Sequence, residues 1–460
     1  MGYRMKLNGD IPTVLFPIET LTRELDSKLV MASALAAQGC RAIVGHKESM
    51  KAIGGASTGV VWQGKSLFRA KSNKHLADEL IRNRSAIMFL HDEGGMHQVK
   101  AWPNHVLKTH RIEYLRKRNV TRICVWGERQ KNVLSSYAEE LKDVIAVTGT
   151  PKFDLCLPKY AWVTAARSEA IRNKYRSFIL VCTRFATVAH SAGQGDPFRR
   201  KMNPALWPDS LDQQSLADLW FSKWQRDVHD FADFVVLTKE LALNFAQYTI
   251  VLRPHPSENL TFYQQAFASF KNVAVTRDES VLPWIRAAEL VVHSNCTTGI
   301  EAVLAGRPVL NLLPECEGRT ELDVEVAREA GQVTGSVSEA VQKAGEFLSG
   351  EAPTYEWSPH AKTMLQNLTR EAVPEVTAET LRVIEEQGIN ASKLTLPKET
   401  KVQDAIRRVI NRPSATYASS KRGPLDPADV EAIVGGYRQN FGKGGRVRHM
   451  TDKYVVLDPA

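Results

Sequence analysis

The segment Leu290-Val-Val-His-Ser-Asn-Cys-Thr-Thr-Gly-Ile-Glu-Ala-Val-Leu-Ala-Gly-Arg-Pro-Val-Leu-Asn-Leu312 decides the fold class. It opens with a short apolar run that is typical of a buried strand, and a turn rich in Ser and Thr follows. The turn leads into a predicted helix over Thr297–Ala305, and a second apolar run begins at Pro308. Strand, helix and strand in this order predict an α/β protein with parallel sheets.

The same alternation extends in both directions along the chain. The first half contains five further apolar runs and one clear helix: strands at Thr13–Phe16, Arg41–Val44, Ala86–Leu90, Arg122–Trp126 and Val144–Val147, and a helix at Glu24–Gln38. A second series starts with the strand Ser177–Cys182 and continues with a helix over 216–247, strands at Tyr248–Leu252 and Val273–Val275, and a helix at Ser336–Ser349. The polar stretch 187–215 between its first elements is expected to be an insertion.

Length and composition indicate a soluble protein with more than one domain. A chain of 460 residues is too long for one ordinary hydrophobic core. Its 43% hydrophobic and 24% charged residues are usual for globular proteins. No stretch approaches the roughly 18 apolar residues that a membrane span needs, and Met1–Asp10 lacks the apolar core of a signal peptide. We therefore expect a cytoplasmic location.

Cysteine and histidine spacing gives no sign of a metal site. The six cysteines are scattered without a Cys-x-x-Cys pair, which argues against a zinc ribbon or a disulfide framework. Four histidines (His91, His97, His105 and His110) lie in one region, but their spacing matches no zinc motif. We expect neither a metal nor a cofactor.

The positive charge is concentrated near the C-terminal end. The formal net charge is +9, and residues 398–460 hold twelve Lys and Arg against seven Asp and Glu. Such a basic tail can contact an anionic membrane surface or nucleic acid, or it can simply be a solvated tail. No basic stripe with interleaved aromatic residues or known nucleic-acid motif accompanies it, so we expect no specific nucleic-acid partner.

One motif is expected to be a chance match. Gly59-Val-Val-Trp-Gln-Gly64-Lys65-Ser66 fits the Walker A pattern. A phosphate-binding loop of this kind needs a preceding buried strand and a following helix. Residues 49–58 do not resemble a strand, whereas Val60–Trp62 does, so the sequence argues against a P-loop.

Two adjacent acids follow the predicted strand Ala86–Leu90. The sequence His91-Asp92-Glu93-Gly94-Gly95 would place them at the carboxyl end of a parallel strand, where open α/β sheets bind ligands. A carboxylate there can deprotonate an acceptor hydroxyl group or attack an anomeric carbon. An acidic turn without function is the competing interpretation, and this motif alone does not decide between them.

Two further constellations follow strands of the second series. In Arg253-Pro-His255-Pro256 the prolines restrict the loop, and Arg253 and His255 can donate hydrogen bonds to a phosphate or a ribose. After His293, hydroxyl groups and free backbone amides at a helix start form an anion site. Ser294, Thr297 and Thr298 are candidate phosphate contacts, and Glu301 is a candidate for the ribose hydroxyl groups; a simple capped helix is the competing interpretation.

These three motifs, in this order, resemble those of bacterial GT-B glycosyltransferases that use CMP-activated acidic sugars, including capsular polysialyltransferases and β-Kdo transferases. Other stretches are similar to the bacterial surface carbohydrate biosynthesis protein family: Pro17-Ile-Glu19, Arg23-Glu24-Leu25-Asp26, Val125-Trp-Gly-Glu128 and Val147-Thr-Gly-Thr-Pro-Lys-Phe-Asp154. The resemblance covers residues 12 to about 312. It implies two Rossmann-like domains that face a central cleft.

The resemblance also implies roles for individual residues. Glu93 matches the acid of the family's acidic motif, with Asp92 beside it, and His255-Pro256 matches the His-Pro pair that binds CMP. Ser294, Thr297 and Thr298 fall on its phosphate turn, although Asn295 and Cys296 interrupt the usual pair of hydroxyl residues. Arg184, after the first strand of the second series, is a further nucleotide-binding candidate.

The implied reaction is metal-independent transfer of Kdo, sialic acid or a related nonulosonate from a CMP-activated donor to a glycan or lipid-linked acceptor. The alternatives are a GT-B relative that uses a UDP-sugar or CDP-glycerol, and a UDP-sugar 2-epimerase, because the pattern Glu301–Val309 occurs throughout that superfamily.

The expected domains are an acceptor domain over 1–160, a nucleotide-sugar domain over 170–390 and a basic extension over 398–460. A helix within 360–390 is expected to cross back to the first domain, and the extension to contact an anionic inner-membrane surface.

Overall fold

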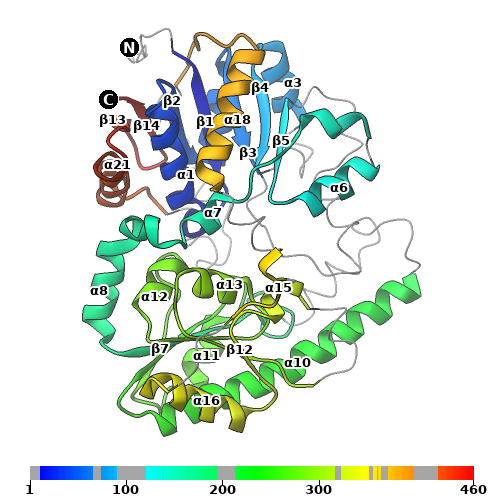
Figure 1. The fold of residues 1–460 in the computed structure, drawn as a ribbon, viewed down its shortest axis with the longest axis vertical. Helices are drawn as coiled ribbons and strands as arrows, with labels where there is room; N and C mark the ends of the chain where they lie inside the picture. Colours follow the sequence, from blue (N-terminus) through cyan, green and yellow to red (C-terminus); the bar gives the residue numbers. More distant parts are fainter. Residues whose placement is uncertain are drawn as a thin grey trace. The chain divides into compact units, whose positions relative to one another are not determined.

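A computed structural model describes residues 11–65, 74–90, 121–137, 139–193, 213–315, 323–351, 356–359, 361–363, 371–396 and 423–460. Asp92 and Glu93 lie outside these residues, as do most of the insertion predicted over 187–215 and the four histidines after Leu90. The chain forms two compact units, each built around one sheet (Figure 1).

The first unit contains an eight-stranded sheet in the order β13-β14-β2-β1-β3-β4-β5-β6. Strands β1 to β6 are parallel, and β1 is buried along its whole length because parallel sheets are covered on both faces. The strands are β1 (Thr13–Ile18), β2 (Arg41–His46), β3 (Val60–Gly64), β4 (Ala86–Leu90), β5 (Arg122–Val125), β6 (Ile145–Val147), β13 (Gly445–Met450) and β14 (Tyr454–Pro459). Strand β3 begins at Val60, inside the Walker A match, which confirms that this match is not a P-loop.

Helices from both ends of the chain cover this sheet. They are α1 (Leu21–Ala36), α2 (Lys47–Ala56), α3 (Lys74–Arg82), α6 (Glu128–Tyr137), η2 (Glu139–Val144), α7 (Pro151–Asp154), α18 (Ala372–Glu386) and α21 (Pro427–Phe441). The chain returns to the unit at α18, within the range expected for a crossing helix. There the backbone N–H of Val373 donates to the buried carboxylate of Asp154 at 2.9 Å. Farther along α18, Arg122 forms an ion pair with Glu386 at 2.8 Å.

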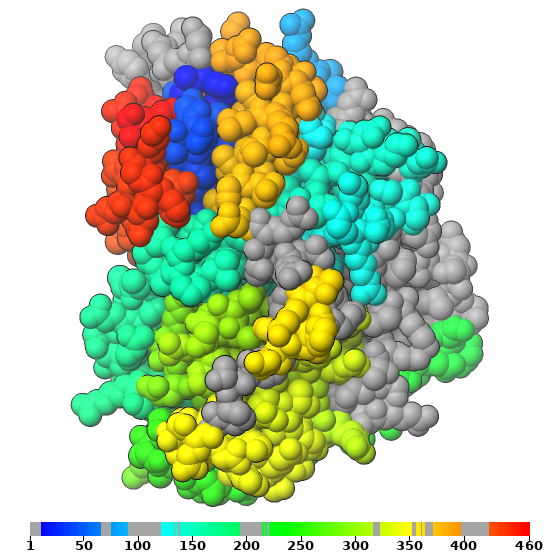
Figure 2. Space-filling view, viewed as in Figure 1, coloured from blue at the N-terminus to red at the C-terminus, as the bar shows by residue number. Residues whose placement is uncertain are grey.

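The C-terminal segment corrects an expectation, because its described part is not a separate appendage. Strand β14 pairs antiparallel with β2, and its residues Tyr454–Leu457 are buried. Arg41 on β2 and Asp458 on β14 form a buried ion pair with an N–O distance of 2.5 Å. Helix α21 packs on α1, so the end of the chain, red in Figure 2, lies directly against its beginning, blue. The segment escaped prediction because its strands form a short hairpin whose pairing partner is distant in sequence, with Arg41 and Asp458 lying 417 residues apart.

The second unit contains a six-stranded parallel sheet in the order β12-β11-β10-β7-β8-β9. The strands are β7 (Phe178–Cys182), β8 (Thr249–Arg253), β9 (Val273–Val275), β10 (Leu290–His293), β11 (Val309–Leu312) and β12 (Gln332–Thr334). The helices are η3 (Pro158–Thr164), α8 (Ala165–Tyr175), α10 (Gln213–Asn244), α11 (Leu260–Ala266), α12 (Val281–Ala287), α13 (Thr297–Leu304), α15 (Glu325–Arg328) and α16 (Val337–Ser349).

Alternate residues of β7 build two cores on the two faces of this sheet. Ile179 and Val181 pack with α10 and α16, whereas Phe178 and Leu180 pack with α8, α12 and α13. Read from β9 to β12, the strands follow the order 3-2-1-4-5-6 of the dinucleotide-binding fold. The predicted α/β fold with two Rossmann-like domains, as in the GT-B architecture, is therefore confirmed. Within the described residues, no helix is both long and apolar enough to cross a membrane.

Candidate functional site

The second sheet has a topological switch point between β7 and β10. Successive strands are added on one side of β7 up to β9, and the order then reverses at β10. In open α/β sheets, ligands bind outside the carboxyl ends of the two strands at such a point. Thr183 and Arg184 follow β7 there, and the turn Ser294–Cys296 follows β10. The topology thus brings Arg184 and Ser294, two of the sequence-predicted residues, to one place.

A buried histidine fixes the start of the turn. The Nδ1 atom of His293 accepts a hydrogen bond from the N–H of Cys296 at 3.1 Å, and Nε2 lies 2.8 Å from the carbonyl oxygen of Ala330. Burial lowers the pKa of His293 to about 4, so the imidazole is neutral and carries its proton on Nε2. A Cβ atom on Gly299 would lie 2.2 Å from this nitrogen, which explains the glycine in the first turn of α13.

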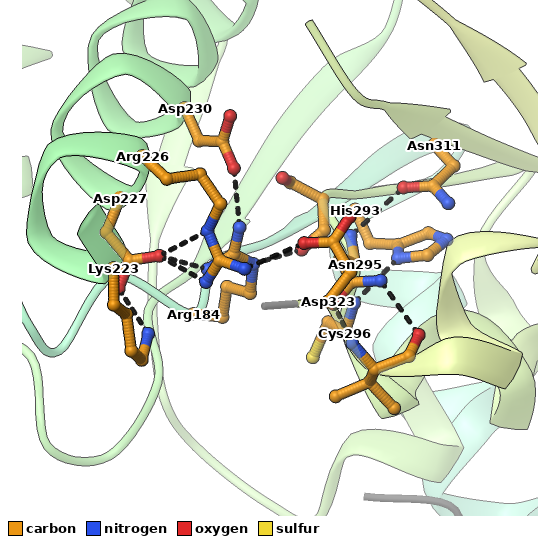
Figure 3. Close-up of polar contacts among 12 residues, drawn as sticks. Arg184, Lys223, Arg226, Asp227, Asp230, His293, Asn295, Cys296, Asn311 and Asp323 are labelled. Atoms are coloured by element: carbon orange, nitrogen blue, oxygen red, sulfur yellow. Dashed lines mark hydrogen bonds and ion pairs between the residues drawn. The ribbon is translucent and has the colours of Figure 1, made fainter. Parts of the chain in front are cut away.

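Asn295 holds the middle of the turn in a left-handed conformation. Its φ angle is +43°, a region that Asn tolerates better than most residues. The side-chain amide pairs with the backbone of Val324: Nδ2 donates to the carbonyl at 2.9 Å, and Oδ1 accepts from the N–H at 2.7 Å. The N–H of Asn295 donates to Oδ1 of Asn311 on β11 at 3.0 Å (Figure 3). Contacts with Val324 and with Asn311 on β11 therefore fix the turn at Asn295.

The side chain of Ser294 is buried in this turn. It is 1% exposed, and its hydroxyl group makes no hydrogen bond with any residue that the structure describes. A buried polar group in this state costs about 1–3 kcal/mol. It lies beside the N-terminus of α13, where backbone amides favour an anion. A ligand with acceptor oxygens, such as a phosphate, would satisfy both groups.

Arg184 connects the turn to α10. Its Nε donates to the carbonyl oxygen of Ser294 at 2.5 Å, while Nη1 and Nη2 bind the carboxylates of Asp227 and Asp230 at 2.7 and 2.6 Å (Figure 3). Burial alone lowers the pKa of Arg184, but the two carboxylates outweigh burial and raise it above its ordinary value. All three edges of the guanidinium group are thus engaged with protein, which fits a role in positioning the turn.

Asp227 is the centre of a larger charge network. It binds Lys223 at 2.6 Å and Arg226 at 2.7 Å, and Arg226 also binds Asp323 at 2.8 Å (Figure 3). Burial raises the pKa of Asp227, but Lys223 and the two arginines hold it well below its usual range. Burial also lowers the pKa of Lys223 to about 8. Three cations therefore balance three anions next to the turn.

The loop after β8 carries the His-Pro motif. The N–H of His255 donates to the hydroxyl group of Thr183 at 3.3 Å and to the carboxylate of Glu258 at 3.2 Å. The Nδ1 atom of His255 accepts from the N–H of Ser257 at 3.2 Å, so a neutral ring carries its proton on Nε2. These contacts join the loop to the residue that precedes Arg184.

Arg253 does not join this cluster through its side chain. Its guanidinium group donates to the carbonyl oxygens of Asp278 and, at 2.6 Å, of Glu279, and it stacks on the ring of Trp284 at 5.4 Å. Burial lowers its pKa to about 10. The guanidinium group of Arg253, at the end of β8, is thus held against the connection between β9 and α12.

The other predicted residues lie on α13 or outside the described chain. Thr297 and Thr298 are half-buried in the first turn of the helix, and Sγ of Cys296 lies 3.4 Å from the hydroxyl oxygen of Thr298. Glu301 is buried one turn later. In the described residues, no group of three or more His, Cys, Asp or Glu side chains is arranged to hold a metal ion.

The charged residues of α10 that organise the site were not predicted from the sequence. Lys223, Arg226, Asp227 and Asp230 are spaced to share one face of α10, a signal that the sequence does contain. Charges on one helix face are usually solvated, however, and only the fold shows that these are buried. Glu258 lies three residues after His255 and could have been singled out for that reason.

No protein-family model and no curated protein matches this chain. Several solved structures are similar to it. UDP-GlcNAc 2-epimerase from Neisseria meningitidis is 12% identical, with 82% of this chain and 99% of that chain covered and a TM-score of 0.45. UDP-GlcNAc 2-epimerase from Methanocaldococcus jannaschii is 14% identical, with coverages of 81% and 99% and a TM-score of 0.46. HepE from Anabaena, in complex with UDP and glucose, is 11% identical, with coverages of 82% and 100% and a TM-score of 0.39.

Proposed function

We propose that this protein is an enzyme that acts on a nucleotide-activated sugar and binds the nucleotide at the carboxyl edge of β7, β8 and β10. The observation that carries the proposal is the buried hydroxyl group of Ser294, which lacks a partner at the switch point of a Rossmann-like sheet. The amides of α13 are further donors on the same edge, and the His255-Pro256 loop lies beside Thr183 there. Together they suit a phosphate group.

The transferred group is proposed to be an acidic sugar on CMP, moved to a surface polysaccharide or glycolipid acceptor. The support for CMP is the His255-Pro256 pair and the resemblance of the three motifs to CMP-sugar transferases. Glu93 is the proposed base or nucleophile, with Asp92 secondary. Arg184 supports the site by holding the Ser294 turn, and Glu301 would face the ribose.

A UDP-sugar or CDP-glycerol as donor, or 2-epimerisation of a UDP-sugar, is the second candidate. The pattern Glu301–Val309 supports it, because this helix start and the following strand occur broadly in the superfamily of these transferases and 2-epimerases. The two candidates share the phosphate site. They differ in the nucleobase of the donor and in the reaction that the sugar undergoes. They are therefore separated by the nucleotide that binds.

Calorimetry with CMP, CDP, UMP and UDP tests the nucleotide site, since a ligand of the folded state binds and stabilises it. CMP as the tightest ligand would support the first candidate, and UDP the second.

The thiol of Cys296 gives an independent readout, because it is half-buried in the turn, while the thiols of Cys40, Cys124, Cys156 and Cys182 are buried. In a Cys316→Ser background, bound nucleotide should slow the alkylation of the Cys296 thiol. Absence of both binding and protection would refute the proposal.

Glu93→Gln tests the chemical step separately from binding. The amide cannot act as a base or nucleophile, so we expect unchanged nucleotide affinity and a loss of transfer by several orders of magnitude. Asp92→Asn is the matched control and should reduce transfer less. Full transfer activity in Glu93→Gln would exclude this assignment.

A further inference from the structure

Glu258 is a buried carboxylate that joins three elements of the second unit. It has 0% exposure and follows β8 in the same loop as His255. Its Oε2 accepts from the hydroxyl group of Thr183 at 2.8 Å and from the phenol of Tyr263 on α11, and its Oε1 accepts from the N–H of His255 at 3.2 Å. The loop is thereby tied to the end of β7 and to α11.

The same loop is also held from its backbone side. Arg277 donates through Nη1 to the carbonyl oxygens of Pro256 at 2.9 Å and of Glu258 at 3.1 Å. The loop further pairs with residues 189–191, where the N–H of Ser191 donates to the carbonyl oxygen of Ser257 at 2.9 Å. Glu258 and the N–H of His255 both bind Thr183, which directly precedes Arg184 at the end of β7. The place of the His255 ring therefore depends on this carboxylate.

The Glu258 carboxylate accepts hydrogen bonds from neutral donors: the Thr183 hydroxyl group, the Tyr263 phenol and the backbone N–H of His255. Burial raises its pKa to about 7, and the hydrogen bonds from Tyr263, Thr183 and His255 offset only part of that effect. The ionisable groups around it are Tyr263, His255 and His190, together with two arginines. Arg277 binds carbonyl oxygens, and Arg184 is paired with α10. The charge of Arg277 acts on Glu258, but among the described residues none forms an ion pair with this carboxylate at the edge where an anion is proposed to bind.

We propose that Glu258 is a positioning residue for the His255–Pro256 loop, and that it takes up a proton when an anionic nucleotide binds at this edge. This inference rests on the proposed function. An incoming phosphate raises the cost of a buried carboxylate nearby, and the cost is removed if the carboxylate becomes a neutral acid. The proton comes from solvent, and no covalent bond of the nucleotide changes. By linkage, nucleotide affinity should fall as pH rises through 7, by at most about tenfold per pH unit for one proton.

Calorimetry at pH 7 in two buffers of different ionisation enthalpy counts the protons taken up. We would titrate CMP and UDP into the full-length wild type and into Glu258→Gln. The wild type should take up more protons than the variant, and the variant should show a flatter dependence of Kd on pH between 6 and 8. Protons taken up by His255 or by the nucleotide are common to both proteins and cancel in the difference.

Glu289→Gln is the matched control, because Glu289 is exposed and directly precedes β10, at the opposite edge of the same sheet. It should behave as the wild type. If Glu258→Gln does not fold, difference infrared spectroscopy of the wild type replaces it: nucleotide binding should create the carbonyl band of a protonated carboxylic acid. Nucleotide binding with equal proton uptake in the wild type and Glu258→Gln, or without that band, would overturn the role of Glu258 alone. A failure of the wild type to bind either nucleotide would overturn the proposed function and this inference together.

Discussion

At the scale of single residues, the candidate site combines one unsatisfied group with several that are fully satisfied. Ser294 has a buried hydroxyl group without a partner, while Arg184 and Asn295 beside it use their polar groups within the protein. Such a division separates a residue that can contact a ligand from residues that hold it in place. It leads to opposite expectations for substitutions at neighbouring positions.

Ser294→Ala should weaken nucleotide binding without reducing stability. The substitution removes a buried polar group that has no partner, so the free energy of unfolding should stay constant or rise by up to about 1 kcal/mol. Calorimetry and chemical denaturation measure the two quantities. Ser392→Ala is a control in the other unit, because its hydroxyl group donates to Gly59 at 2.5 Å and accepts from Thr13 at 2.9 Å. It should lower stability by about 1–2 kcal/mol and leave binding unchanged. A destabilised Ser294→Ala protein would show that this hydroxyl group already has a partner.

Glu258 should make the stability of the protein depend on pH. Its folded-state pKa of about 7 lies above the ordinary value of 4.5, so the folded state binds the proton more tightly than the unfolded state. Its contribution to stability is therefore fully present below pH 4.5 and is lost as pH rises through 7, by about 3 kcal/mol at most. Glu258→Gln cannot ionise and should show a smaller loss between pH 5 and 8 in denaturation experiments. Identical pH profiles would contradict the raised pKa.

Residue roles were harder to predict than residue positions. Strand ends put Arg184, His255 and Ser294 on the carboxyl edge of a sheet, and this followed from apolar runs in the sequence. The partners of Arg184, however, lie 43 and 46 residues further along, on α10. Local spacing carries no information on such a long-range ion pair. The sequence therefore singled out Arg184, but it did not reveal the contacts with Asp227, Asp230 and Ser294 that hold this side chain.

At the scale of elements, the strands of both parallel sheets were the most predictable part of the molecule. Continuous apolar runs such as Phe178–Cys182 are buried on both faces and have no other stable environment. The hairpin of β13 and β14 has a different character. Arg446 and Arg448 are exposed on β13, which is the edge strand, so only β14 shows an apolar run. The hairpin could be assigned only from the pairing of β14 with β2, which no local sequence pattern reveals.

The ion pair between Arg41 and Asp458 should be essential for docking the hairpin. Asp458→Asn leaves a buried guanidinium group without its charge partner, which typically costs about 3–5 kcal/mol. Asp452→Asn is the matched control: Asp452 is exposed in the turn between the same two strands and should change stability little. Denaturant unfolding of the first unit measures both. Equal stability of the two variants would mean that Arg41 finds another partner.

At the scale of the whole molecule, the fold changes how the proposed membrane contact has to be tested. Deletion of the extension would also remove β14 and expose the edge of β2, so a loss of binding could reflect unfolding. Substitution of the exposed residues Lys443 and Arg446 by Ala keeps the hairpin and removes two charges. If the extension contacts anionic lipid, this variant should co-sediment less with anionic liposomes, by about 1 kcal/mol of binding free energy per charge. Unchanged co-sedimentation would remove these two residues from the proposed contact.

The return of the chain to its first sheet also determines the order of folding during synthesis. Every strand of the second unit leaves the ribosome before α18 and β14 exist, so that unit can complete its sheet first. Until β14 emerges, the outer edge of β2 is unpaired and Arg41 lacks its counter-ion Asp458. A nascent chain in this interval presents a strand edge that other chains can bind. We expect the first unit, although its strands are translated first, to be the last to become resistant to proteolysis and the part that most needs chaperones.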